Sequence, residues 1–169
     1  MILTHDEILS LIESGEIEID PFEPALVGPG SVDLRLSNQF RVFKRLEGPV
    51  RVVEDIEARD LTEPVVAEKE FILRPGETVL GLTLERIRLS DSLCGWLEGR
   101  SRFARVGLLV HMTAAFIQPG TNNRQVLEIS NLAPFPLALT IGSPVCQFIF
   151  QRTLGRAVYR GRHQKQDCI

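Results

Sequence analysis

Apolar residues occur along this chain mostly in short runs separated by turn-forming residues. The exception is the beginning of the chain, where apolar residues recur at helical spacing between Thr4 and Gly15. This periodicity predicts one amphipathic helix over residues 5–14, with Gly15 as its stop. Thr4 and Glu7 have the spacing of a capping box, which predicts that the threonine side chain caps the helix.

After a loop rich in proline and glycine at residues 21–30, the apolar runs are bounded by turn dipeptides such as Pro75-Gly76 and Pro119-Gly120. Runs of this kind predict β-strands. The predicted strands cover residues 31–36, 39–44, 50–54, 78–84, 108–113, 125–130, 136–140 and 145–151. Regular short strands with turn signals are typical of a β-sandwich or barrel. We therefore predict an all-β fold with one N-terminal helix and short helical turns.

Length and composition indicate one soluble globular domain over residues 1–169. The chain has 169 residues, of which 44% are hydrophobic and 24% are charged, and this is ordinary for a domain with a sizeable core. No apolar run approaches the roughly 20 residues that cross a bilayer. The first residues lack the basic region of a secretory signal. Three widely spaced cysteines suggest no disulfide framework, so we expect a reducing, cytoplasmic location.

The distribution of charge favours a small anionic ligand. The net charge of −3 provides no global basic field that would recruit nucleic acid or a membrane. Basic residues are nevertheless dense at residues 100–105 and 152–165. Local positive charge on a mildly acidic protein suits a small anion better than a long polyanion. The simpler interpretations are a solvated charged turn for the first cluster and a disordered chain end for the second.

The segment 101–106 is too short for a long helix, and it predicts one or two helical turns. Ser101 would lie at the N-terminus of that turn and would share a face with Arg105, four residues later. A helix N-terminus flanked by arginines binds phosphate well. The turn is therefore a candidate phosphate site.

Glu128 is a carboxylate within an otherwise apolar run. Burying a carboxylate costs several kcal/mol unless it is paired, hydrogen-bonded or protonated, so Glu128 is a candidate functional group. It could equally be an outward-facing residue on a half-exposed strand, with Leu127 and Ile129 pointing inward. The simplest interpretation of His111 is a strand histidine with a structural partner.

Metal-dependent and covalent catalysis lack their usual motifs in this sequence. His5, His111 and His163 are scattered, and no histidine or cysteine spacing typical of zinc occurs. The zinc deaminase signature is absent as well. No nucleophile elbow surrounds Ser101. We therefore predict chemistry without zinc.

Several motifs occur together and in a fixed order along the chain, and together they favour a functional site more strongly than each motif does alone. The chain resembles the dCTP deaminase family of the dUTPase-like superfamily through Gly30-Ser31-Val32-Asp33-Leu34-Arg35-Leu36, Gly95-Trp96-Leu97-Glu98-Gly99-Arg100-Ser101 with Ala104-Arg105, Val110-His111-x-Thr113-Ala114, Pro119-Gly120, Leu127-Glu128, the segment from Gly142 through Cys146-Gln147-Phe148, and Tyr159-x-Gly161-Arg162-His163-Gln164-x-Gln166. The match spans most of the chain.

This resemblance implies a homotrimer of distorted β-barrel (β-clip) subunits with active sites at the subunit interfaces. It implies a hydrolase that acts on a cyclic amidine C–N bond and converts dCTP to dUTP and ammonia. Zinc would not take part, and Mg²⁺ would arrive on the triphosphate. Inhibition by dTTP is a further implication. Residues 152–169 would form a mobile lid.

The resemblance also implies residue roles. Glu128 would be the catalytic carboxylate, Ser101 and the carbonyl of Ala114 would orient the attacking water, and Arg105 would be the site arginine. The implied nucleotide contacts are Arg100, Ser101, Arg102, Phe103, Ala104, Arg105, Gln118, Val126, Leu127, Glu128, Gln147, Tyr159, Arg162 and Gln166.

Deamination of dCTP can be catalysed by a single carboxylate at the position of Glu128. Deamination at C4 of cytosine needs water to attack while N3 gains a proton and ammonia leaves. Without a metal to activate the water, one carboxylate must act first as base and then as acid. We expect partial burial to raise the pKa of Glu128 toward the working pH, where such a shuttle is most effective.

One departure from the family pattern bears on the product. The family has aspartate where this chain has Gln118, and it has an aromatic residue and a glycine where this chain has Thr121 and Asn123. Glutamine forms hydrogen bonds but is not a base, so dUTP is the expected product. Gln147, which is familiar in dUTP-hydrolysing relatives, keeps a bifunctional enzyme that yields dUMP open. A dUTPase and a nucleotide-binding protein without turnover also stay open.

Overall fold

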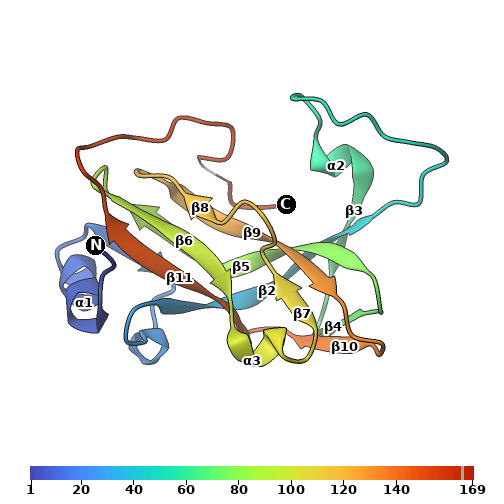
Figure 1. Ribbon diagram of the computed structural model, residues 1–169, viewed down its shortest axis with the longest axis horizontal. Helices are drawn as coiled ribbons and strands as arrows, with labels where there is room; N and C mark the ends of the chain where they lie inside the picture. The colour runs from blue at the N-terminus through green and yellow to red at the C-terminus, as the bar shows by residue number, and fades with distance from the viewer. Residues whose placement is uncertain (165) are drawn as a thin grey trace.

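The computed structural model describes residues 1–164 and 166–169, and it is built mainly of antiparallel strands (Figure 1). The helical elements are α1 (His5–Glu13), η1 (Pro24–Leu26), α2 (Ala58–Leu61) and α3 (Ser101–Ala104). The strands are β1 (Ile17–Asp20), β2 (Val32–Phe43), β3 (Thr62–Val66), β4 (Glu70–Leu73), β5 (Thr78–Leu89), β6 (Leu93–Gly99), β7 (Leu108–Val110), β8 (Phe116–Ile117), β9 (Asn122–Asn131), β10 (Leu137–Thr140) and β11 (Pro144–Arg152).

One curled sheet organises the molecule. Its strand order is β7-β9-β5-β2-β11-β6-β8, with β1 beside β5 and β3 beside β2, while β4 and β10 form a separate pair. The two 12-residue strands change register within their length, between Leu36 and Phe40 and between Leu82 and Arg86. Such irregularities bend a strand and increase its twist, so the sheet curls into a half-barrel. The all-β prediction is confirmed.

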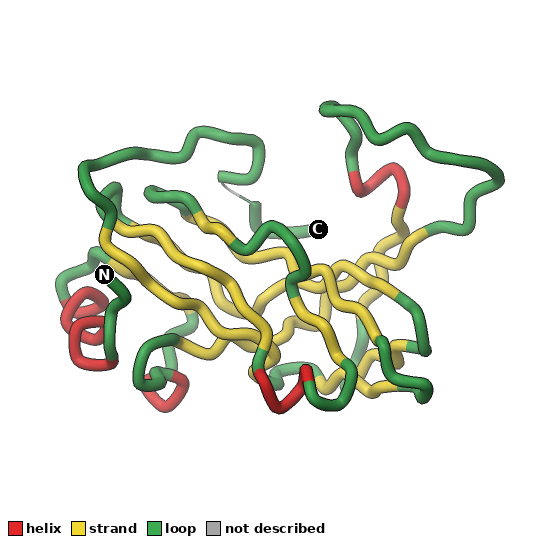
Figure 2. Tube along the Cα trace, in the orientation of Figure 1, coloured by secondary structure: helices red, strands yellow, loops and turns green. Residues whose placement is uncertain are grey.

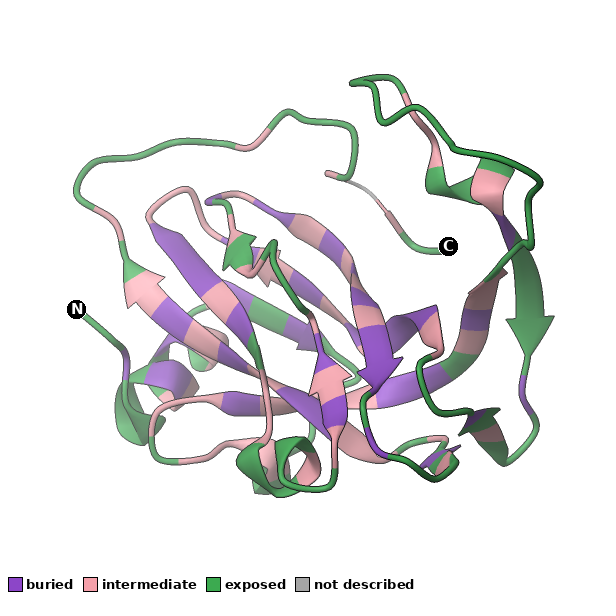
Figure 3. Cartoon of the chain, turned by 45° about the vertical axis from the view of Figure 1, so that its right-hand side comes forward, coloured by how far each residue is buried: buried purple, intermediate pink, exposed green. Residues whose placement is uncertain are grey.

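Buried residues alternate with more exposed residues along the strands, as the colours show (Figure 3). In β2, Val32, Leu34 and Leu36 are buried while the residues between them are partly exposed. Strands β6 and β11 approach each other closely at Gly95, where a Cβ would lie 2.2 Å from the Phe148 ring. Only glycine fits there, which explains the Gly-Trp step in the motif that leads to α3.

The helix predictions are confirmed, with one correction of detail. Helix α1 starts at His5 as expected, and α3 forms the short turn predicted at 101–106 (Figure 2). The capping-box prediction is wrong, because the Thr4 side chain makes no capping hydrogen bond. The Thr4 backbone carbonyl instead accepts the Ile8 N–H at 2.9 Å. None of the helices in the described part of the chain is long and apolar enough to span a membrane.

One strand prediction is wrong and another is wrong in part. Residues 50–54 form no strand, because they lie in an exposed excursion between β2 and β3 where Val52 is 89% exposed. The run predicted over 108–113 ends at Val110, because His111 has φ +59° and cannot continue a strand. The runs predicted at 31–36 and 39–44 join into the single strand β2. Strands β1, β3, β4, β6 and β8 were not predicted.

Candidate active site

The turn that begins at Gly99 is anchored to the neighbouring strands through Arg100. Arg100 has extended backbone geometry and precedes α3 as its N-cap. Its guanidinium lies 2.8 Å from the Asp33 carboxylate, donates to the Pro144 carbonyl at 2.7 Å, and sits 5.9 Å from the Phe103 ring centre. Phe103 in turn packs against the core. Arg100 therefore fixes the turn to β2 and β11, whatever contact it makes with a nucleotide.

The rest of the turn faces outward. Ser101, Arg102, Ala104 and Arg105 are all exposed. A hollow of about 390 Å³ adjoins the turn, and its walls include Gly99, Arg100, Ser101, Ala104, His111 and Gln147. Two exposed arginines and a serine hydroxyl at the start of a helical turn are the groups that a phosphate recognises.

Glu128 lies on the partly exposed face of β9. Its neighbours Leu127 and Ile129 point into the core and are fully buried, so strand alternation turns the carboxylate to the other side. The Glu128 side chain is 34% exposed. The outward-facing interpretation is therefore correct for the direction of the side chain, but the carboxylate is not simply solvated, because His111 contacts it.

His111 connects the two groups that the resemblance assigned to the attacking water. Its Nδ1 lies 3.0 Å from Oε2 of Glu128, and its Nε2 lies 3.1 Å from the Ala114 carbonyl oxygen. The His111 N–H also donates to the Glu128 carbonyl at 2.9 Å. The His111 ring thus links the Ala114 carbonyl to Glu128, and His111 has a structural partner, while the roles assigned to Ala114 and Glu128 stay predictions.

The expected direction of the Glu128 pKa is wrong. Burial alone would raise the pKa, because it penalises the charged carboxylate, but the contact and charge of His111 together with the N–H groups of Glu128 and Met112 outweigh that effect. The pKa of Glu128 therefore lies below 4.5, its ordinary value. The lowered pKa favours the ionised carboxylate, which is the form that acts as a base.

A larger cavity of about 880 Å³ lies on the Glu128 side of the sheet. Seven of the predicted site residues line it, namely Ala114, Gln118, Val126, Glu128, Tyr159, Arg162 and Gln166. Leu127 turns its side chain into the core, so only its backbone can face a ligand. Ser101 belongs to the wall of the smaller hollow, and neither cavity described here contains both Ser101 and Glu128.

The tail beyond β11 runs back to β9 (Figure 1), and its residues Tyr159, Arg162 and Gln166 are among those that line the larger cavity. Asn123 donates from its amide to the His163 carbonyl at 2.5 Å, and the Arg124 N–H donates to the Gln166 carbonyl at 2.8 Å. The mobility predicted for residues 152–169 stays a prediction, and Lys165 lies outside the described residues.

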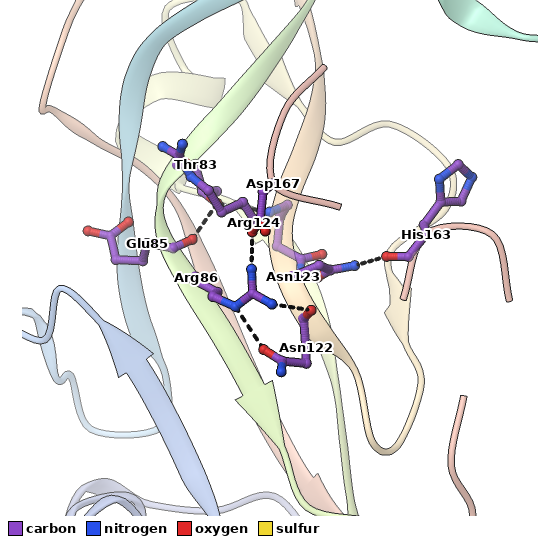
Figure 4. Close-up of polar contacts among 9 residues, drawn as sticks. Thr83, Glu85, Arg86, Asn122, Asn123, Arg124, His163 and Asp167 are labelled. Carbon is purple, nitrogen blue, oxygen red and sulfur yellow. Dashed lines mark hydrogen bonds and ion pairs between the residues drawn. The ribbon is translucent and has the colours of Figure 1, made fainter. Parts of the chain in front are cut away.

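Side-chain ion pairs also dock this tail. Arg86 of β5 pairs with Asp167 while its Nε and Nη2 donate to the side chain and carbonyl of Asn122 at 2.9 and 3.1 Å (Figure 4). Arg162 lies 2.9 Å from Glu57, in the excursion that carries α2. The tail is therefore joined both to the sheet and to the excursion on the far side of the cavity.

Among the residues that the structure describes, no three histidine, cysteine or acidic side chains cluster as a metal site would require. Independence from zinc stays a prediction.

Comparison with known proteins decides the family. A model of the dCTP deaminase-like family matches residues 2–153. The chain belongs to this family. Proteins named dCTP deaminase, dUMP-forming from Acidothermus cellulolyticus and Mycolicibacterium vanbaalenii are 42% identical over 175 residues and 44% identical over 156 residues. The first match covers 98% of this chain and 91% of the relative, and the second covers 90% and 80%.

Solved structures agree on the fold of this dCTP deaminase-like chain. The 2′-deoxycytidine 5′-triphosphate deaminase of Agrobacterium tumefaciens has a TM-score of 0.71 at 24% identity over 90% of this chain, which spans about half (48%) of that protein's length. A dUTPase of Staphylococcus bacteriophage 80alpha has a TM-score of 0.52 at 10% identity, over 87% of this chain and 97% of that one. The predicted dUTPase-like fold is confirmed.

Several residues of the deaminase-like site were not singled out from the sequence as functional. Asn123, Arg124 and Arg86 hold the tail, yet they lie just outside the strands predicted over 125–130 and 78–84 and carried no functional signal there. The sequence shows that asparagine replaces the family glycine at position 123. It does not show that Asn123 contacts His163, which lies 40 residues away in the sequence. The sequence feature that could have identified His111 as a site residue is its position in the Val110-His111-x-Thr113-Ala114 motif.

Replacing His111 by asparagine should move the pH dependence of the enzyme. Asparagine tolerates the positive φ of this position but carries no charge, so desolvation would raise the pKa of Glu128. A lowered pKa keeps the carboxylate ionised as the pH falls. The acid limb of kcat/KM should therefore shift to higher pH in His111→Asn than in the wild type. A pH profile of dCTP turnover tests this, and an unshifted acid limb would contradict the pairing.

Proposed function

We propose that this protein hydrolyses dCTP to dUMP in two steps, deamination followed by release of pyrophosphate. The overall balance is dCTP + 2 H₂O → dUMP + NH₃ + pyrophosphate. The observation that carries the deamination step is that Glu128 and Ala114, which His111 joins through its two ring nitrogens, both line a cavity large enough for a nucleotide. The names of the relatives favour dUMP as the final product over the dUTP expected from Gln118.

In the deamination step, water would lie between the Glu128 carboxylate and the Ala114 carbonyl. Each oxygen has a lone pair left after its contact with His111. As water attacks C4 of cytosine, Glu128 takes a proton from it and delivers this proton to N3. The hydroxyl group now on C4 then loses its proton to the C4 amino group. The amino group leaves as ammonia, and the C4 carbonyl forms. Holding the water in line supplies the entropic part of the acceleration.

The phosphates would be bound by the exposed arginines. Arg102 and Arg105 project from the α3 turn, and Arg162 lines the larger cavity from the tail. Charge-assisted bonds to phosphate are roughly twice as strong as neutral ones. The substrate would be the Mg²⁺ complex of dCTP, in which the ion shields the phosphate charge.

A homotrimer with shared sites is part of the same proposal. Ser101 and Glu128 line different hollows of one chain, yet deamination of one nucleotide needs both. Pairing the α3 turn of one subunit with the β9 face of another would complete the site.

The second candidate is an enzyme that stops at dUTP, and Gln118 favours it. Gln118 is exposed on the wall of the larger cavity, and an amide there cannot take a proton from a water that attacks phosphorus. In the two-step proposal, Gln118 orients that water, and the cationic turn stabilises the leaving pyrophosphate.

The products formed from dCTP distinguish the candidates. Purified protein with dCTP and Mg²⁺ should release ammonia, dUMP and pyrophosphate in equal amounts, as measured by chromatography. Accumulation of dUTP would support the second candidate, and cleavage of dUTP with dCTP untouched would leave a dUTPase. A nucleotide that raises Tm without any turnover would leave only a binding protein. The Gln118→Asp variant should increase the rate of dUTP cleavage and leave ammonia release nearly unchanged.

A further inference from the structure

The side chain of Gln147 joins three strands directly beneath the α3 turn. Gln147 lies in β11, opposite Asp33 of β2 and Glu98 of β6. Its amide oxygen accepts the Ser31 hydroxyl at 2.9 Å, and its amide nitrogen donates to the Gly99 carbonyl at 3.1 Å. One side chain thus connects the start of β2 with the end of β6, across the strand that separates them.

The chemistry of these groups permits only one orientation of the Gln147 amide. The Gly99 carbonyl can only accept a hydrogen bond, so Nε2 of Gln147 must face it. Oε1 then faces Ser31, and the serine hydroxyl is the donor. Without that hydroxyl, Oε1 would be left unpaired in a half-buried position, and the amide would lose the contact that holds its plane. Loss of one partner of such a bond costs more than the bond itself contributes.

The α3 turn depends on this anchor because it is too short to hold itself. It has four residues, and its N–H groups of Phe103 and Ala104 both donate to the Arg100 carbonyl at 3.0 Å. A single helical turn is not stable in isolation. Its position is therefore set by what fixes the two residues before it. Asp33 and Pro144 fix the Arg100 side chain, and Gln147 fixes the Gly99 carbonyl.

We propose that Ser31 is a positioning residue for the reaction, acting through Gln147 and Gly99 on the placement of Ser101. The proposal rests on the proposed function, in which the Ser101 hydroxyl orients the attacking water. Ser31 lines neither of the two cavities, and its hydroxyl donates to Gln147, so its effect would pass through the Gln147 amide. Gln147 is accordingly a positioning residue as well. A displacement of a water-orienting group by a fraction of an ångström lowers the rate of the chemical step more than it weakens substrate binding.

The kinetic test compares three serine variants. Ser31→Ala should lower kcat about tenfold, a change of about 1.4 kcal/mol in the barrier, while KM for dCTP changes less than about threefold. Ser31→Thr keeps the hydroxyl and should retain most of the wild-type kcat. Ser14→Ala serves as the matched control, because Ser14 also donates a hydroxyl hydrogen bond, to the Leu11 carbonyl at 3.2 Å, but lies at the end of α1. A Ser31→Ala variant within twofold of the wild-type kcat would overturn the proposal.

Two further measurements separate positioning from a general loss of stability. If Ser31 acts through Gln147, then Ser31→Ala combined with Gln147→Ala should be no slower than Gln147→Ala alone, whereas losses that multiply would contradict the relay. Hydrogen exchange at the N–H groups of Ala104 and Arg105 should be faster in Ser31→Ala than in wild type. This measurement needs no turnover, so it decides the inference even if the wild type fails to deaminate dCTP. Unchanged exchange there would refute the anchor.

Discussion

Replacing Glu128 by glutamine is expected to lower kcat for dCTP deamination by about 10²–10⁴-fold, the range typical of general acid–base groups. Glutamine preserves the shape of the side chain and its hydrogen-bonding capacity but cannot carry the proton from water to N3. The affinity for dCTP should be largely retained, because the cavity wall and the cationic groups are unchanged. Ammonia release in steady state measures the first effect, and titration calorimetry with dCTP measures the second.

The matched control is Glu63→Gln, which removes the same charge from an exposed position on β3 and should leave kcat within twofold of wild type. A Glu128→Gln variant with more than about a tenth of the wild-type kcat would show that Glu128 is not the proton shuttle, because a factor of ten is only about 1.4 kcal/mol.

The same variant provides a test of shared sites. Ser101→Ala and Glu128→Gln chains should each be nearly inactive. In a trimer whose sites combine the α3 turn of one subunit with the β9 face of another, mixed assemblies contain some sites that carry neither substitution. Unfolding and refolding the two variants together should therefore restore part of the activity. Mixtures that stay inactive, or a wild type that is monomeric by light scattering, would contradict the shared site.

Local patterns were sufficient for parts of the fold. Helix α1 and the α3 turn follow from helical spacing and short length, and the Pro-Gly turns delimit β5 and β9. The strands that were missed depend on their partners. Strand β3 is mostly exposed, and it exists because it pairs with β2. Residues 50–54 show the converse, because a valine-rich run forms no strand where no neighbouring strand lies alongside it. Pairing over long distances cannot be read from one segment.

For the site as well, sequence motifs predicted which residues take part, but not the effects of residues from neighbouring strands. The family motifs assigned Glu128 and Ala114 to one site, and in the structure His111 contacts both of them. The direction of the Glu128 pKa could not be predicted from its strand alone. Apolar neighbours suggest a raised pKa, but the group that determines the sign is His111, which reaches the carboxylate only because β7 pairs with β9.

The contacts of Asn123 also explain why asparagine can replace the glycine of the family pattern at this position. In the family pattern a glycine stands here, whereas the Asn123 amide donates to the His163 carbonyl and accepts from Gln125 at 2.6 Å. The side chain thus adds a contact between β9 and the tail. The chain has lost the flexibility of glycine at this point and has gained a fixed attachment for the segment that lines the cavity.

Deleting residues 158–169 should separate the role of the tail in ligand binding from any role in stability. The ion pairs that dock it are substantially exposed, with Asp167 at 59% and Arg162 at 50%, and exposed pairs contribute only about 0–1 kcal/mol. The Tm of the free protein should therefore change little. Triphosphate binding and dCTP turnover should both fall by at least about tenfold, because the deletion removes Arg162 and opens the cavity to water. The preference for dCTP over dCMP should fall in parallel.

Arg162→Gln in the full-length chain is the informative companion to this deletion. It keeps the tail that lines the cavity but removes one phosphate-binding charge, so it should weaken dCTP binding while leaving dCMP binding nearly unchanged. Hydrogen exchange at Tyr159, whose N–H donates to the Pro119 carbonyl at 2.8 Å, should slow when dCTP is added to the wild type. Exchange at Tyr159 that is equally fast with and without dCTP would show that the tail does not close on the nucleotide, and that its contacts with β9 serve the free chain alone.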